Sequence, residues 1–359
     1  MTLRFSHAVS AAAFVAVSAG PMLHGASAIE GDLFSPSPIA LVAPDDASVA
    51  ALPSPGPKAG AIAGISLRRT SDIDYGLLQD INNNLSSLHI DTDTVGIGPA
   101  LTYGAVTPGG YFVSFSAAGR FGENTTDFNV TPQNSLLFTI DGQSAFNFGN
   151  NPLQGSADYD DREIDFTADV WRPLRGVSFG AVHDPGDAGL EGMAERFRSS
   201  LNFGVRGGYR EQSLDLNLQS QPNNVMQLSG KLDTFEFGAH VGASHVLRIN
   251  DRTALEGLVK LGIIVDSSDL DGVQTFGNNT FRQSDSEAHV ALEVAPRISL
   301  AYDMMGDGKS KFWVSAHGAY VSGAPTMRLP TQQNETLRIG HDALYELGVG
   351  LGVTIELGQ

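Results

Sequence analysis

The sequence has no cysteine, few basic residues and, beyond residue 28, no long apolar run. Without cysteine it cannot form disulfides, thiolate metal sites or a cysteine nucleophile. Its 22 Lys and Arg against 40 Asp and Glu give a net charge of −18, which argues against nucleic acid as a partner. The lack of an 18-residue apolar window after residue 28 excludes a bundle of membrane helices. A mean hydropathy of −0.06 still allows a membrane barrel, whose strands alternate apolar and polar residues.

Residues 1–28 have the layout of a secretory signal peptide. Arg4 supplies a basic start, residues 8–20 are mostly apolar, and Ala26-Ser27-Ala28 is a small-x-small cleavage site. We therefore expect export, with cleavage after Ala28. Residues 29–58 are predicted to be a Pro-rich periplasmic linker, because six prolines between Pro36 and Pro57 remove amide donors that a helix or ladder needs.

Residues 59–359 show an apolar-polar alternation with a period of two, which is the pattern of β-strands. In residues 287–302 every even-numbered position is apolar, whereas the odd-numbered positions carry Glu287, His289, Glu293 and Arg297. The eleven segments with this pattern are 61–67, 94–105, 111–121, 163–171, 177–181, 201–210, 233–249, 253–265, 287–302, 311–321 and 343–357. The region is therefore predicted to be all-β.

A soluble sandwich and a transmembrane barrel both have alternating strands, and the placement of aromatic residues favours the barrel. The segments are also longer than ordinary globular strands and suit a tilted crossing of a bilayer. Aromatic residues on the apolar face form two predicted girdles at the two membrane surfaces. The outer girdle is Phe121, Tyr209, Phe235, Phe237, Tyr320 and Tyr345, and the inner girdle is Tyr103, Tyr111, Phe203, Tyr302 and Phe312.

The connections between segments alternate in length. Tight turns are expected at Thr107–Gly110, Asn250-Asp251 and Met305–Gly308, and long connections at 71–93, 122–161, 267–286 and 322–341. Short periplasmic turns and long external loops are typical of bacterial outer-membrane barrels, which have an even number of strands. Twelve antiparallel strands are predicted, with 136–148 as the twelfth. The barrel would have ten strands if neither this segment nor 177–181 forms a strand.

The chain resembles Gram-negative outer-membrane β-barrel proteins of the porin-like kind. The last segment matches the assembly signal of that family at Glu346, Gly348, Leu351 and Val353. The chain departs from the family pattern at its end, Glu356-Leu357-Gly358-Gln359, where many members carry a terminal aromatic residue. The resemblance implies residence in the bacterial outer membrane, with membrane lipid and the outer-membrane assembly machinery as partners.

Three consecutive segments place ionisable residues on the inward face. This predicted lumen charge network consists of Glu236, His240, Arg248, Glu256, Lys260, His289, Glu293 and Arg297. Because isolated charges are costly in a narrow interior, Lys260 and Arg297 are predicted to be held by Glu256, Glu293 or Glu236.

Residues suited to catalysis or metal binding are sparse. Ser315 and His317 lie two apart on one face, as a nucleophile and base could, but side chains at this spacing are neighbours by geometry alone. Asp72 and Asp74, with Asp91 and Asp93, offer calcium-type oxygen ligands without the spacing of a known loop. The sequence therefore predicts no catalytic residues, no bound metal and no cofactor.

The predicted function is a narrow passive pore for small polar solutes or ions. Inward-facing glycines leave space in the lumen and favour it: Gly64, Gly96, Gly98, Gly104, Gly238, Gly242, Gly348, Gly350 and Gly352. The alternative is a closed structural or adhesive barrel that acts through its acidic, Asn- and Asp-rich external loops. In that alternative the external loops contact lipopolysaccharide or divalent ions. An outer-membrane hydrolase is a distant third hypothesis.

Overall fold

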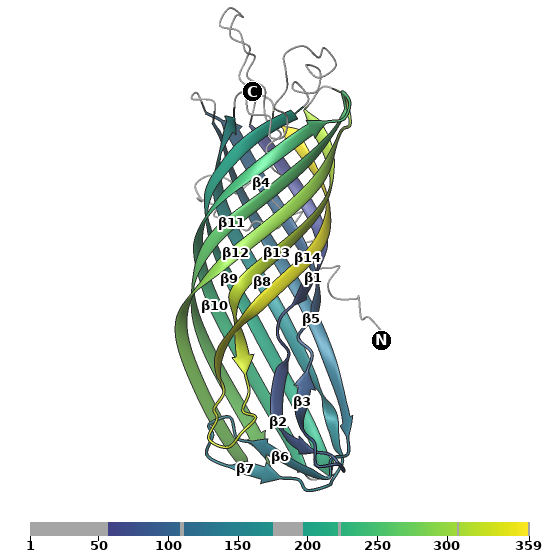
Figure 1. Ribbon diagram of the computed structural model, residues 1–359, viewed down its shortest axis with the longest axis vertical. Coiled ribbons are helices and arrows are strands. Elements are labelled where there is room, and N and C mark those ends of the chain that lie inside the picture. Colours follow the sequence, from purple (N-terminus) through teal and green to yellow (C-terminus); the bar gives the residue numbers. More distant parts are fainter. Residues whose placement is uncertain (1–56, 108–110, 175–196, 222–223, 307–308, 358–359) are drawn as a thin grey trace, which may run out of the picture.

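The computed structural model describes residues 57–107, 111–174, 197–221, 224–306 and 309–357. The predicted signal peptide, nearly all of the predicted linker and segment 177–181 lie outside these residues. Ten long antiparallel strands form a closed barrel (Figure 1). They are β1 (Lys58–Arg69), β4 (Thr94–Val106), β5 (Phe112–Val130), β8 (Leu153–Leu174), β9 (Phe197–Gln221), β10 (Asn224–Arg248), β11 (Thr253–Phe276), β12 (Asn279–Asp303), β13 (Ser310–Arg328) and β14 (Arg338–Glu356). Within the described residues, no helix has the length and apolar character that a membrane span requires.

The first and last strands close the ladder, with Lys58 opposite Glu356 and Arg69 opposite Tyr345. The barrel has ten strands, which is the stated alternative to the leading prediction of twelve. Residues 136–148 do not cross it, because a turn around Gly142 divides them into two short strands. These are β6 (Asn134–Phe138) and β7 (Ala145–Asn147), which join β2 (Ile73–Gln79) and β3 (Leu85–Ile90) in a separate four-stranded sheet.

Several barrel strands are about twice as long as a membrane crossing requires. Strands β9, β10 and β12 have 25 residues each, whereas a tilted membrane strand needs about 9–11. The outward face changes character along β11, where Val259, Leu261 and Ile263 are exposed near one end and Asp269 and Asp271 near the other. The apolar part is the membrane band, and the polar part extends beyond the outer surface.

The prediction of long external loops at 122–161, 267–286 and 322–341 was therefore partly wrong. Strands β5, β8, β11, β12, β13 and β14 all continue into these segments. In the continuations of β5, β8 and β11 the outward positions are mostly polar, and the inward positions include the buried Phe128, Tyr159 and Leu270, opposite to the membrane part. This reversal made the continuing strands look like loops in the sequence.

The external half of the molecule has an apolar core of its own. Its centre includes Tyr75, Leu137, Leu214, Leu216, Met226 and Leu337, all buried. Strands β5 and β8 to β12 provide the outer wall, and the four-stranded sheet lies in the lower half of Figure 1 with them. Burial of this much apolar surface stabilises the external half without lipid.

The external end of the β13–β14 hairpin fills part of this core. Gln212 of β9 donates from Nε2 to the carbonyl of Pro325 at 2.8 Å, and the amide of Gly76 donates to the carbonyl of Pro330 at 3.0 Å. Strand β12 correspondingly pairs with β13 only from Glu293 to Asp303. On the external side of Glu293, the β13–β14 hairpin lies inside the barrel rather than in its wall.

The eleven predicted girdle residues all lie on the outward face of their strands or strand ends. Nine of them are exposed, and Tyr209 and Tyr320 are partly covered by neighbouring rings. Tyr209 lies 5.1 Å from Phe235 and Tyr320 lies 5.1 Å from Tyr345, measured between ring centroids. These outer aromatic residues lie where the outward face changes from apolar to polar, at the level expected for the membrane surface.

Candidate functional site

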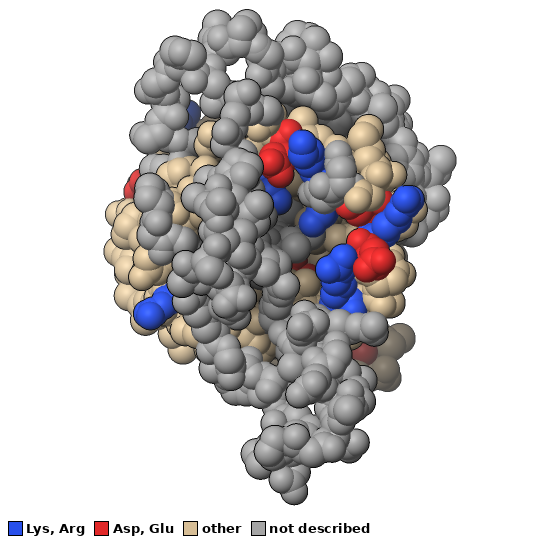
Figure 2. Space-filling model, turned by 90° about the horizontal axis from the view of Figure 1, so that it is seen from above, with Lys and Arg blue, Asp and Glu red and all other residues tan. Residues whose placement is uncertain are grey.

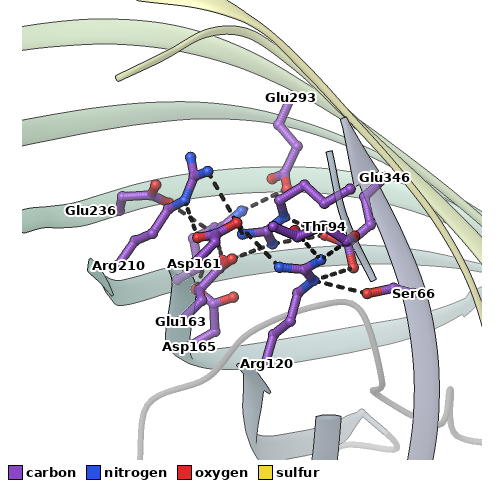
Figure 3. A network of polar contacts seen from close by, with 12 residues as sticks. Ser66, Thr94, Arg120, Asp161, Glu163, Asp165, Arg210, Glu236, Glu293 and Glu346 are labelled. Carbon is purple, nitrogen blue, oxygen red and sulfur yellow. Dashed lines mark hydrogen bonds and ion pairs between the residues drawn. The ribbon is translucent and has the colours of Figure 1, made fainter. Parts of the chain in front are cut away.

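A dense group of buried charges crosses the barrel at the level of the outer aromatic residues. We call it the central charge network, and its members are Arg68, Arg120, Asp161, Glu163, Asp165, Arg206, Arg210, Glu236, Glu293 and Glu346 (Figure 3). Its level follows from neighbours along the strands, since Arg120 precedes Phe121, Arg210 follows Tyr209 and Glu346 follows Tyr345. Because successive side chains on a strand point to opposite faces, the aromatic ring points outward and the neighbouring charged group points inward.

Arg68 and Asp161 anchor one side of the network. Arg68 of β1 donates from Nη1 to Asp161 Oδ2 at 3.0 Å and from Nε to Glu346 Oε2 at 2.8 Å. Asp161 of β8 also accepts from Arg120 Nη1 at 3.1 Å and from Arg210 Nε at 2.8 Å. Because β4 and β5 separate β1 from β8 in the wall, the Arg68–Asp161 pair joins non-adjacent strands through the lumen.

Arg206 of β9 anchors the other side. Its Nη1 donates to Glu293 Oε1 of β12 at 2.6 Å, and its Nη2 donates to Asp165 Oδ1 at 3.0 Å and to Glu236 Oε2 at 3.1 Å. Oxygens of Glu163, Asp165 and Glu236 lie within 4.8 Å of one another, a spacing that could hold a cation. In the structure the positive charge beside these three carboxylates is the guanidinium of Arg206.

A smaller polar cluster around Asp169 lies closer to the periplasmic end. Asp169 Oδ2 accepts from Lys260 Nζ at 3.0 Å, and its Oδ1 accepts from Asn202 Nδ2 at 2.7 Å and lies 2.7 Å from His240 Nε2. Lys260 is also 5.9 Å from the centre of the Trp171 ring. Asp169 and Lys260 are almost fully buried, so their pairing offsets a large cost of desolvation.

The structure separates the eight predicted lumen residues into different groups. Glu236 and Glu293 belong to the central charge network, where both contact Arg206. His240 and Lys260 contact Asp169, an acceptor absent from the prediction. Glu256 and Arg297 are buried in the lumen.

Two of the eight residues lie outside the buried lumen clusters. Arg248 is exposed near the periplasmic turn, where its Nη2 lies 3.3 Å from Asp251 Oδ1. His289 packs against His341 of β14 and faces Asp266 of β11. The prediction of one continuous patch was therefore wrong, since the strands are long enough to distribute the eight residues over several levels.

Most of the central network was missed because its partners come from distant parts of the sequence. Glu163, Asp165 and Asp169 share one face of a segment whose other face holds Ile164, Phe166 and Val170, so their inward direction was readable. Their pairing with β1 or β9 depends on the closure of the barrel, for which the sequence has no local signal.

Most of the inward glycines do not leave open space. A Cβ atom on Gly96 would lie 2.8 Å from the Arg120 guanidinium carbon, and one on Gly204 would lie 2.4 Å from His240 Nε2. A Cβ on Gly348 would lie 2.4 Å from His317 Nε2. These glycines make room for long side chains from neighbouring strands, which removes the argument from glycine for a pore.

The predicted acidic loop residues meet near the end of the β2–β3 hairpin. Asp72, Asp91 and Asp93 have carboxylate oxygens within 4.8 Å of one another, and His89 Nε2 lies 2.8 Å from Asp72 Oδ2. A hydrogen bond to Asp74 raises the pKa of His89, and partial burial, with Asp91 nearby, raises the pKa of Asp93. Binding of divalent ions at these loops stays a prediction.

The remaining predicted residues occupy ordinary positions on β13 and β14. Ser315 Oγ donates to the carbonyl of Gly350 at 3.5 Å, and His317 is buried against Gly348. In the predicted assembly signal, Glu346 is buried in the central network, while Leu351 and Val353 are exposed on the membrane face. Figure 2 shows the molecule from the end opposite the external sheet. At this end Lys and Arg side chains lie beside Asp and Glu side chains.

Comparison with known proteins finds solved structures that match most of the chain at low sequence identity and low TM-score. No protein-family model and no curated protein matches the chain. The outer membrane protease OmpT from Escherichia coli is 10% identical, with a TM-score of 0.38 over 86% of this chain and 99% of that chain. The translocator domain of autotransporter NalP from Neisseria meningitidis is 10% identical, with a TM-score of 0.40 over 84% and 88%. A Pseudomonas aeruginosa FadL homologue is 8% identical, with a TM-score of 0.26 over 84% and 91%.

The protein is a bacterial outer-membrane β-barrel. The closed antiparallel ladder leaves no unpaired edge in the membrane part, and the outward apolar band is bordered by aromatic residues. The inward face at the same level is charged and hydrogen-bonded. These features belong to the chain itself and do not depend on the similarity scores.

Proposed function

We propose that this barrel is closed to solutes and acts at the cell surface through its external half. The observation that supports this most directly is the central charge network. Arg68 and Asp161 join β1 to β8, which are three positions apart in the wall, and Arg206 joins β9 to Glu293 of β12, also three positions apart. A water-filled passage at this level would expose these side chains, yet all four are buried.

The apolar core gives a second barrier on the external side of the network. Leu214 and Leu216 of β9 and Met226 of β10 point inward and are fully buried against the external sheet and hairpin. Such a core excludes water because no polar group in it needs hydration. Ions would have to cross both the network and this core.

A narrow channel is the second candidate, and the polar lumen on the periplasmic side of the network favours it. Asp169, His240 and Lys260 line that part. Conduction would require the Arg68 and Arg206 contacts to open together with the external core. Each broken buried ion pair costs about 3–5 kcal/mol, which disfavours spontaneous opening.

The surface of the external half is predominantly acidic. Outward or loop carboxylates include Asp72, Asp74, Asp80, Asp91, Asp158, Asp215, Asp269 and Asp271. Such a surface suits a basic partner directly, or an anionic lipopolysaccharide layer through bridging divalent ions. No catalytic step is part of this proposal.

The test is the conductance of the refolded wild-type protein in a planar bilayer, with insertion verified by heat-dependent mobility on SDS gels. A closed barrel gives no steady ion current, while an open porin measured in parallel gives steps. The variant Arg206→Met serves as a matched sample in which the network is broken. A steady current through the wild-type protein would refute closure and support the channel.

The external surface can be tested separately with liposomes that carry the inserted protein. Their binding to immobilised lipopolysaccharide and to a basic polypeptide is measured with Mg²⁺ and with EDTA. Binding to lipopolysaccharide in Mg²⁺ alone supports ion bridging, and binding to the polypeptide in both conditions supports a basic partner. Binding to neither would contradict the proposed role of the acidic surface.

A further inference from the structure

Asp266, His289 and His341 meet where the barrel wall changes its pairing. Strand β12 pairs with β13 no further than Glu293, and His289 lies four residues beyond that point. Asp266 of β11 is directly opposite His289 in the β11–β12 register. His341 is on β14, where the β13–β14 hairpin turns into the barrel opposite Pro325.

The two imidazoles are stacked, with ring centres 4.0 Å apart and an angle of 28° between the planes. One ligand atom from each of the three residues lies within 4.8 Å of the other two. The closest ionic contact, from His289 Nδ1 to Asp266 Oδ2, is 3.7 Å and too long for a hydrogen bond. The three side chains are therefore in contact without a short hydrogen bond between them.

Each of the three residues also has a buried polar atom with no hydrogen-bond partner in the structure. These atoms are Asp266 Oδ1, His289 Nδ1 and His341 Nε2. Asp266 itself is 2% exposed, so its carboxylate is almost completely removed from bulk solvent. Buried polar atoms without partners are costly, and one ion bound between these three residues would satisfy all of them.

The chemistry of the three groups identifies that partner as a transition-metal ion. Two imidazole nitrogens and one carboxylate oxygen are ligands that Zn²⁺ binds with a fourth position left for water. Ca²⁺ and Mg²⁺ prefer sites made of oxygen atoms, which excludes them here.

We propose that Asp266, His289 and His341 form a zinc-type metal site that fastens the β13–β14 hairpin to the wall. A tetrahedral ion with bonds of about 2.0–2.1 Å would draw the ligand atoms to roughly 3.3 Å apart. The required movement is small. Gly323 assists, because a Cβ at this position would lie 2.7 Å from His289 Cε1 and displace the ring.

Metal binding at this place would replace the missing pairing between β12 and β13. The ion would join β11, β12 and β14 at the level where the hydrogen-bonded ladder ends. Occupancy should therefore protect the hairpin connection, residues 329–337, from protease.

The experiment uses the full-length mature protein, refolded in detergent without a polyhistidine tag and stripped of metal with EDTA. Titration calorimetry measures the binding of ZnCl₂ and, separately, of CaCl₂. The variants are His341→Ala and Asp266→Asn, the second keeping the shape of the side chain. The matched control is His89→Ala, because His89 and the nearby Asp72 are the competing metal-binding group on the external surface.

We expect one Zn²⁺ per chain in the wild-type protein and in His89→Ala, with no comparable binding of Ca²⁺. Affinity should fall by at least ~10-fold in His341→Ala and Asp266→Asn, since loss even of an outer-shell partner typically costs that much. Zn²⁺ should also slow cleavage within 329–337 in the wild-type protein but not in Asp266→Asn. Heat-dependent gel mobility identifies folded samples, and Asp266→Asn decides the result if His341→Ala does not fold.

Absence of stoichiometric Zn²⁺ binding to the folded wild-type protein would overturn the proposal. So would loss of binding in His89→Ala with binding retained in Asp266→Asn, because that result places the ion at the external carboxylates. Equal affinity for Ca²⁺ that is lost in Asp266→Asn would likewise contradict a site built on two imidazoles.

Discussion

Replacing Arg206 by Met tests whether the central charge network holds the barrel together. The substitution keeps most of the side-chain volume and removes the cation shared by Asp165, Glu236 and Glu293. These carboxylates then remain buried beside Glu163 without their principal donor. We expect the barrel to lose stability and its lumen to admit water at this level.

The size of the loss follows from the geometry. At an effective dielectric constant of about 20, charges about 3–4 Å apart attract by roughly 4–6 kcal/mol per pair, most of which offsets desolvation. Breaking one buried pair costs about 3–5 kcal/mol net. Because Arg206 donates to three carboxylates at 3.1 Å or less, the loss in the free energy of unfolding should be about 5 kcal/mol.

The assay is reversible urea unfolding in lipid vesicles, followed by the fluorescence of Trp171 and Trp313. The control is Arg162→Met, because Arg162 is exposed on β8 and 3.3 Å from Asp160, where an ion pair contributes about 1 kcal/mol or less. Adding Glu293→Gln to Arg206→Met should recover part of the loss. A loss below about 1 kcal/mol for Arg206→Met, or equal losses for both arginines, would refute the reasoning.

Three further predictions concern other parts of the molecule. Val259→Arg on the membrane face should destabilise the barrel by about 2–4 kcal/mol in vesicle unfolding, whereas Asp271→Arg farther along the same face of β11 should have little effect. Leu216→Ala in the external core should cost about 2–5 kcal/mol and speed proteolysis of the external half, and Leu261→Ala on the lipid face should not speed it. Burial raises the pKa of Tyr75, so stability should be constant below pH ~10 and decline above it as the unfolded chain loses the proton. In Tyr75→Phe this alkaline decline should be smaller, and an identical decline in both proteins would contradict the assignment.

The membrane part was predictable because one physical rule governs it. Lipid on one side and a polar lumen on the other force the period-two pattern that residues 287–302 display, and β12 follows it from Val290 to Tyr302. The ten strands include ten of the eleven segments with this pattern, and the eleventh lies outside the described residues. Segment 136–148 was misassigned because alternation alone does not show which strand it pairs with.

The external half was not predictable by the same rule, because its environment is reversed. Leu214, Leu216 and Leu218 alternate with Asp215 and Asn217 in the pattern of any half-buried strand. Whether the leucines face lipid or protein depends on the position of the membrane surface along β9. The aromatic residues mark that position, and combining them with the change of parity would have located the boundary.

The candidate site was predictable in its polarity and not in its partners. Glu236, Lys260 and Glu293 lie on the inward face that parity predicts, with Lys260 and Glu293 buried and Glu236 half-buried. Their contacts with Arg206 and Asp169 depend on curvature that brings non-adjacent strands within the reach of one side chain. A long Arg or Lys can reach a strand three positions away in the wall, so neighbouring strands were too small a set to consider.

The opposite polarity of the two halves constrains how the protein can enter the membrane. Outward residues such as Asp158, Asp215 and Asp269 end on the far side, although each carboxylate costs about 2.5–3.5 kcal/mol at the bilayer centre. A finished external half would carry all of these groups through hydrocarbon at once. We therefore expect the hairpins to pass through a water-lined path in the assembly machinery as unpacked chains. The leucine core would condense only after they emerge, which makes secretion across the membrane a step in the folding of this barrel.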